Sequence, residues 1–272
     1  MALIEFDLTG KAAVVIGGGR GIGKGIALTL AEAGADVLAV ARTEAEVLQT
    51  AEEIQHFGVK GIGLRADATN PQDLDRVVEA ALSRWGQIDV LVNSAGGAFV
   101  RKPLVPLPEE SPSWARDLKE FNTITTEEEW GGMMNANLLC TFLATRAVGP
   151  HMIQRRKGKV INITSMTGAK GYPYHVLYCT TKAGGIMFTR SLALEWAPYH
   201  VNVNAIAPGY LDTQMTEIYM QDEAMKRRFI GSIPIGRLCE PREVGLLAVY
   251  LASEASNYLT GQTIFLDGGM TA

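Results

Sequence analysis

Short apolar runs alternate with amphipathic segments along the whole chain. The apolar runs, such as Ala12-Ala13-Val14-Val15-Ile16, contain little polar alternation, which is typical of parallel strands covered on both faces. They predict strands at 11–16, 36–41, 61–66, 88–92, 158–164, 200–206 and 262–267. The amphipathic segments predict helices at 22–33, 43–56, 71–85, 127–149, 175–197 and 241–252. This alternation predicts an α/β fold, a doubly wound, mostly parallel seven-stranded sheet with helices on both faces.

A glycine-rich turn follows the first predicted strand, and its spacing indicates what it binds. Gly17, Gly21 and Gly23 form G-x-x-x-G-x-G between a strand and a helix, a geometry that presents backbone N–H groups to a pyrophosphate. A nucleoside-triphosphate loop would need Ser or Thr after Gly23-Lys24, but Gly25 stands there and the magnesium-binding hydroxyl is missing. The pattern favours a dinucleotide, and a purely structural glycine turn is the alternative.

One segment interrupts the alternation of strands and helices. Residues 97–125 contain four prolines, which prevent one continuous helix. Trp114, Leu118 and Phe121 lie at helical spacing and predict a short ordered helix inside this insert, which could be a lid or a subunit contact. Thr126 and Glu129 form the pattern of a capping box for the helix that follows.

Composition and charge limit the class of protein. The 272 residues are 47% hydrophobic and 20% charged, enough for one large domain over 1–272 without disulfides. The three cysteines have neither disulfide nor metal-ligand spacing, so we expect no metal and a cytoplasmic location. A net charge of −4 argues against nucleic-acid binding. No secretory signal or membrane-spanning run is expected.

A second informative stretch contains Tyr178 and Lys182. Four residues apart on a helix, the two side chains share one face. An ammonium beside a phenol favours the phenolate, so the pKa of Tyr178 is expected to fall towards working pH. That would suit a proton donor or acceptor, although a surface pair has the same spacing.

Six stretches in order then resemble one family. They are GGGRGIG, RADAT, NSAG, MNANLLCTF, the pair INITS and YCTTK, and PGYLDT. Together they resemble the short-chain dehydrogenase/reductase family over nearly the whole chain except the insert. The resemblance implies a Rossmann fold. Two positions depart from the family pattern, Ile16 before the glycine loop and Ser94 in NSAG, and both concern the support of turns.

The resemblance also implies roles for individual residues. Asn137, Ser165, Tyr178 and Lys182 match the catalytic tetrad. Tyr178 would exchange a proton with the substrate oxygen, Ser165 would hydrogen-bond that oxygen, Lys182 would bind the nicotinamide ribose, and Asn137 would hold a water. The expected cofactor contacts are Gly17, Gly21, Ile22, Gly23, Asp67, Ala68, Asn93, Ala95, Gly96, Tyr178, Lys182, Pro208, Gly209, Leu211 and Thr213.

The end of the second predicted strand indicates which cofactor is used. An acid there selects NAD, whereas a nearby arginine accommodates the 2′-phosphate of NADP. Ala41 stands at that position, Arg42 follows it, and Arg20 lies in the glycine loop. Both cations favour NADP(H). Ala41 carries no charge that could repel a phosphate, and Asp36 lies at the other end of the strand, too early to play that part. NAD(H) remains possible, with Arg42 as a solvated cation and Arg20 paired to a local acid.

The sequence therefore predicts an NADP(H)-dependent oxidoreductase that interconverts a secondary alcohol and a ketone. The family's 3-oxoacyl-thioester reductases resemble it well, but sugar-acid, steroid and cyclic-alcohol dehydrogenases share the same motifs. The insert and the segment 210–235 are expected to bound the substrate pocket. Family resemblance implies a homotetramer. An enoyl-type reductase acting on C=C and a non-catalytic NADP-binding regulator are the alternatives.

Overall fold

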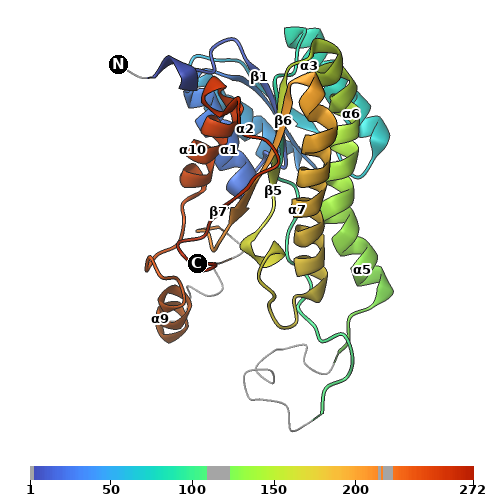
Figure 1. Cartoon of the computed structure of the whole chain (residues 1–272), viewed down its shortest axis with the longest axis vertical. Coiled ribbons are helices and arrows are strands. Elements are labelled where there is room, and N and C mark those ends of the chain that lie inside the picture. The colour runs from blue at the N-terminus through green and yellow to red at the C-terminus, as the bar shows by residue number, and fades with distance from the viewer. Residues whose placement is uncertain (1–2, 109–122, 214–215, 217–222) are drawn as a thin grey trace.

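A computed structural model describes residues 3–108, 123–213, 216 and 223–272. Its centre is one seven-stranded, wholly parallel sheet in the order β3-β2-β1-β4-β5-β6-β7 (Figure 1). The strands are β1 Ala12–Ile16, β2 Asp36–Ala41, β3 Gly61–Arg65, β4 Val90–Asn93, β5 Gly158–Ile163, β6 Val201–Pro208 and β7 Thr263–Leu266. The predicted doubly wound sheet and all seven strands are confirmed.

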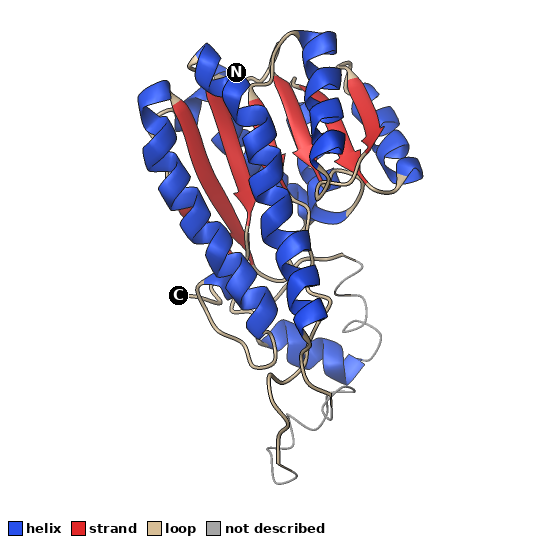
Figure 2. Ribbon diagram, turned by 90° about the vertical axis from the view of Figure 1, so that its right-hand side faces the viewer, coloured by secondary structure: helices blue, strands red, loops and turns tan. Residues whose placement is uncertain are grey.

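Helices cover both faces of this sheet (Figure 2). They are α1 Gly21–Glu32, α2 Glu44–Gln55, α3 Pro71–Trp85, α5 Glu127–Met134, α6 Cys140–Arg155, α7 Val176–Trp196, α9 Glu223–Gly231 and α10 Pro241–Ala252. Short 3-10 turns occur at Ile4–Phe6, Met166–Gly168, Ala197–Tyr199 and Glu254–Ser256. None of the helices in the described part of the chain is long and apolar enough to cross a membrane.

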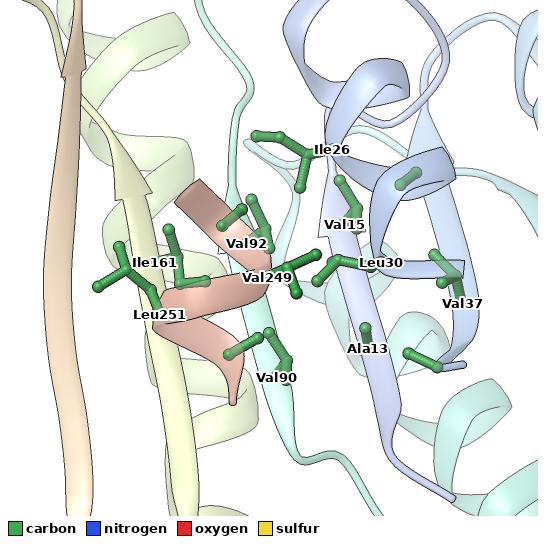
Figure 3. Packing of buried hydrophobic residues seen from close by; sticks show 14 of the residues in the cluster. Ala13, Val15, Ile26, Leu30, Val37, Val90, Val92, Ile161, Val249 and Leu251 are labelled. Atoms are coloured by element: carbon green, nitrogen blue, oxygen red, sulfur yellow. The ribbon is translucent and has the colours of Figure 1, made fainter. Parts of the chain in front are cut away.

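Alternate residues of β1 face opposite sides of the sheet, which builds two separate cores. Ala13 and Val15 pack with α1 and α10, the core shown in Figure 3. Val14 and Ile16 pack with side chains of α3, α6 and α7. All four side chains are almost completely buried, so the strand must be apolar on both faces, as its sequence is.

The predicted helix at 127–149 is wrong in two respects. It begins with the expected capping box of Thr126 and Glu129, but a π-helical turn at Asn135–Leu139 divides it. It also continues through Pro150 to Arg155. Pro150 lies on the exposed side, where water can replace the backbone hydrogen bond that proline removes.

Two observations concern the segments expected to bound the substrate pocket. The sequence patterns did not predict α9, which lies within 210–235. The helix expected from Trp114, Leu118 and Phe121 falls outside the described residues.

Candidate functional site

The glycine loop is packed too tightly for any larger residue. A Cβ atom on Gly23 would lie 2.0 Å from the carbonyl oxygen of Gly17, and one on Gly17 would lie 2.7 Å from the amide nitrogen of Ala95. Gly17 also has φ +83° and Gly21 φ +53°, conformations that glycine adopts freely. The first turn of α1 carries no acid, and the backbone N–H groups at a helix N-terminus attract anions. The loop therefore fits the pyrophosphate of a dinucleotide.

The loop after β4 closes the other side of this cradle. Gly96 has φ +141°, and a Cβ there would lie 2.4 Å from Oδ1 of Asn137. Ala95 packs on the core beneath α3 and α6, as does Ala68. Ile22, at the start of α1, packs on the core of the other face.

Asn93 supports the sheet from inside it. Its Nδ2 donates to Oγ1 of Thr145 at 3.0 Å and to Oδ1 of Asn162 at 2.8 Å. Asn162 in turn donates to Oγ1 of Thr189 at 2.9 Å. Through these bonds the Nδ2 group of Asn93 links β4 and β5 to α6 and α7, and the predicted cofactor contact at Asn93 stays a prediction. The sequence motif located Asn93, but its two partners, Thr145 and Asn162, could not be predicted from the sequence.

Asn137 lies in the π-helical turn, and its side chain forms hydrogen bonds with the backbone of Gly97. Its Oδ1 accepts from the Gly97 N–H at 3.0 Å, and its Nδ2 donates to the Gly97 carbonyl at 3.0 Å and to the Met133 carbonyl at 3.2 Å. Both Nδ2 hydrogens are used. The predicted water held by Asn137 stays a prediction, and in this structure the side chain fixes the backbone of Gly97.

Ser165 and Tyr178 meet just beyond the carboxyl end of β5. Ser165 precedes a 3-10 turn, and its Oγ accepts from the Thr167 hydroxyl at 3.0 Å. Tyr178 lies in the first turn of α7 and is half-buried. Burial raises the pKa of Tyr178 to about 12, and a side-chain hydrogen bond with Ser165 acts in the opposite direction. Two members of the predicted tetrad are thus in direct contact.

Lys182 lies one helical turn from Tyr178 and is buried. Its Nζ lies 5.5 Å from the centroid of the Tyr178 ring and donates to the Ile163 carbonyl at 3.1 Å. Burial lowers the pKa of Lys182 to about 8. The expected fall in the pKa of Tyr178 is therefore wrong for the chain itself. Removal of the phenol from water outweighs the neighbouring groups, and Lys182 is not among those that shift it.

The segment after β6 lies over the glycine loop. Gly209 packs closely on the residue after β7, because a Cβ there would lie 2.8 Å from the Cα of Asp267. Thr213 reaches the loop, its Cγ2 lying 3.9 Å from the place of a Cβ on Gly21. Leu211 points into the core and is buried, and its predicted cofactor contact stays a prediction. Pro208, at the end of β6, is paired with Leu266.

Charged side chains surround the ends of β2 and β3. Nη1 of Arg20 lies 3.6 Å from Oε1 of Glu46. The charge of Arg42 helps to lower the pKa of Asp67, although hydrogen bonds from Thr69 are the larger cause. Arg20 therefore pairs with a local acid, as the alternative to phosphate binding expected, and that acid is Glu46. Helical spacing places Glu46 on α2, but only packing brings it to the loop.

Three aromatic side chains beyond Ser165 also escaped the sequence patterns. The rings of Tyr210 and Phe229 lie 4.4 Å apart, and Tyr172 shares a side-chain hydrogen bond with Tyr210. Tyr172 and Tyr210 pack in one cluster with Met166, which directly follows Ser165. This places part of the segment 210–235 beside the tetrad. Among the described residues there is no group of His, Cys, Asp and Glu that could hold a metal ion.

Comparison with known proteins agrees with this geometry. A family model described as enoyl-(acyl carrier protein) reductase matches residues 17–271. The chain is 36% identical to the 3-oxoacyl-[acyl-carrier-protein] reductase of Vibrio cholerae, over 97% of this chain and 98% of that protein. It is also 36% identical to the 2-dehydro-3-deoxy-D-gluconate 5-dehydrogenase of Escherichia coli, over the full length of both. A solved 7α-hydroxysteroid dehydrogenase, complexed with NADH and 7-oxo glycochenodeoxycholic acid, superposes with a TM-score of 0.86 at 28% identity, covering 99% of this chain and 98% of its own.

Proposed function

The chain belongs to the short-chain dehydrogenase/reductase family and is an NAD(P)-dependent oxidoreductase, and on that premise we propose that Tyr178 is its general acid and base. Oxidoreduction between an alcohol and a ketone follows from its relatives. The contact between Tyr178 and Ser165 is the observation that carries the proposal. Two hydroxyl groups that meet at the carboxyl edge of the sheet can both reach one substrate oxygen.

The chemistry divides between the chain and its cofactor. The bound nicotinamide supplies or accepts the hydride. With its raised pKa, Tyr178 is a neutral phenol at physiological pH and donates its proton to the carbonyl oxygen during reduction. Ser165 hydrogen-bonds the same oxygen as negative charge develops there. Lys182 would hold the nicotinamide ribose, and its pKa of about 8 allows it to exchange a proton near physiological pH. Asn137 positions the loop at Gly97.

NADP(H) is the proposed cofactor, with NAD(H) as the alternative. Ala41 leaves the end of β2 without an acid, Arg42 follows it, and Arg20 lies in the glycine loop. Glu46 acts against this preference, because it pairs with Arg20. Separate titrations with NADPH and NADH, followed by nicotinamide fluorescence, test the proposal. NADPH should bind at least tenfold more tightly, equivalent to about 1.4 kcal/mol, and equal or tighter binding of NADH would contradict it.

The proposed substrates are ketones of the classes that the relatives reduce or form, a 3-oxoacyl thioester or a keto sugar acid. The aromatic group of Tyr172, Tyr210 and Phe229 would form the wall of the pocket. A panel of both substrate classes with NADPH tests this, and loss of NADPH absorbance without an alcohol product would overturn it.

An enoyl-type reductase is the second candidate, because the matching family model has that description. The spacing of Ser165, Tyr178 and Lys182 favours carbonyl chemistry. Product analysis separates the two, since reduction of C=C leaves the carbonyl group intact.

We also propose a homo-oligomer, with a tetramer as the expected form, and a cytoplasmic location. Helices α6 and α7 present several exposed apolar side chains, and Leu194 is 80% exposed. Exposed apolar side chains gathered on neighbouring helices suit burial against a second copy. Light scattering during gel filtration should give a multiple of 29.4 kDa, and a monomer would contradict the proposal.

A further inference from the structure

The carboxylate of Glu46 lies against the glycine loop, where the sequence places no acid. A Cβ on Gly19 would lie 3.2 Å from Oε2 of Glu46 and 3.2 Å from the Cβ of Ala41. Oε1 of the same carboxylate pairs with Arg20 at 3.6 Å. Glu46 therefore brings a negative charge, from the first turn of α2, to the neighbourhood of Ala41.

Two contacts hold α2, the helix of Glu46, against the glycine loop and α1. Thr50, one turn further along α2, is buried and its Oγ1 lies 3.3 Å from the Gly19 carbonyl and 2.9 Å from the Glu46 carbonyl. Glu53, seven residues after Glu46, accepts from Nζ of Lys24 on α1 at 2.7 Å. Residues 46, 50 and 53 share one face of α2, so the whole face is held against the loop and α1. The position of Glu46 is a consequence of helix packing.

The pair with Arg20 is open to water and can be exchanged. The side chain of Arg20 is 71% exposed and that of Glu46 is 31% exposed. Ion pairs of this exposure contribute little to stability. A doubly charged phosphate can therefore compete for Arg20, but it must do so next to the Glu46 carboxylate, which repels it.

We propose that Glu46 sets the preference between the two nicotinamide cofactors by competing with the 2′-phosphate of NADP(H) for Arg20. The inference rests on the proposed placement of the adenosine ribose between the glycine loop and β2. NAD(H) carries no phosphate there, so its affinity does not depend on this competition. The ratio of the affinities for NADP(H) and NAD(H) is then smaller than Arg20 and Arg42 alone would give.

The test is a set of dissociation constants for NADPH and NADH, measured by nicotinamide fluorescence on the full chain. Glu46→Gln removes the charge and keeps the shape. It should lower the dissociation constant for NADPH about 5- to 10-fold, the range expected for removal of one like charge near the phosphate. The dissociation constant for NADH should change less than about twofold. Glu44→Gln is the matched control. Glu44 belongs to the same first turn, but two residues along the helix place its side chain on another side.

The Arg20→Ala background tests the mechanism. There the gain from Glu46→Gln should shrink to the contribution of repulsion alone, because no guanidinium remains to be released. An equal shift of NADPH and NADH, no shift of NADPH, or the same gain from Glu44→Gln would overturn the inference. The wild-type ratio of the two affinities tests the NADP(H) proposal separately, so either proposal can fail without the other.

Discussion

The amide of Asn137 bonds both backbone groups of Gly97, forty residues earlier in the chain. One bond runs from the Gly97 N–H to Oδ1 and the other from Nδ2 to the Gly97 carbonyl, each at 3.0 Å, and both are buried. The side chain can do this because it projects from the π-helical turn and because Gly96 has no Cβ to obstruct it. A backbone irregularity in one helix therefore positions the loop that closes the cofactor cradle.

Asn137→Ala should lower the free energy of unfolding by about 2–4 kcal/mol, because both buried Gly97 groups lose their partner. Urea unfolding of wild type and variant measures this. Asn135→Ala is the control, since Asn135 lies in the same π-helical turn and is exposed, and its effect should stay within about 0.5 kcal/mol. Equal effects of the two substitutions would mean that the bonds to Gly97 contribute nothing particular.

Gly23→Ala should weaken the proposed cofactor binding. The added methyl group would lie 2.0 Å from the Gly17 carbonyl oxygen, so the loop must open before the side chain fits. We expect NADPH affinity to fall more than tenfold, about 1.4 kcal/mol or more, in fluorescence titration.

Gly131→Ala is the matched control for that substitution. Nothing lies within 4 Å of a Cβ at Gly131, which belongs to α5. The alanine should leave NADPH binding unchanged and stabilise the protein by up to about 1 kcal/mol through its higher helix propensity. Unchanged NADPH binding in Gly23→Ala would contradict the assigned role of the loop.

The buried ammonium of Lys182 should make stability depend on pH. Its pKa is about 8 in the folded chain and 10.5 ordinarily, so the unfolded chain binds more protons between these values. The free energy of unfolding should therefore rise with pH from about 8 to 10.5 on account of this residue, and the cost of the buried charge is fully present below pH 8.

Lys182→Met removes that contribution and serves as the comparison. Relative to the variant, wild type should gain about 2 kcal/mol in unfolding free energy between pH 7.5 and 9.5, measured by urea unfolding. Lys159, whose pKa burial also lowers to about 8, is present in both proteins and cancels. Parallel pH curves would show that Lys182 titrates normally.

How far the sequence predicts this protein depends on the range of each interaction. The strands follow from local apolar runs, and the start of α5 from Thr126 and Glu129. The π-helical turn could not be predicted, because nothing in the local pattern at Asn135–Leu139 signals it. The residue that Asn137 contacts from this turn, Gly97, lies 40 residues earlier in the chain. The predicted helix ended before Pro150, but the helix continues through it. A proline inside a helix costs less stability where it is exposed to water, and exposure cannot be seen in the sequence.

The site shows the same division. The motifs located Ser165, Tyr178 and Lys182 correctly relative to one another, since spacing and strand order determine them. The direction of the pKa change at Tyr178 was wrong, because four-residue spacing reveals a neighbouring charge but not the burial that outweighs it. Glu46 was missed for a related reason, since only the packing of α2 on Gly19 brings it to the loop.

The central claim is that Tyr178 transfers the proton, and Tyr178→Phe tests it most directly. The substitution keeps the ring and removes only the hydroxyl group. Turnover of a ketone that wild type reduces with NADPH should fall at least a hundredfold, the lower end of what a positioned acid contributes, while the dissociation constant for NADPH changes less than about threefold. Turnover within tenfold of wild type, with cofactor binding intact, would contradict the account.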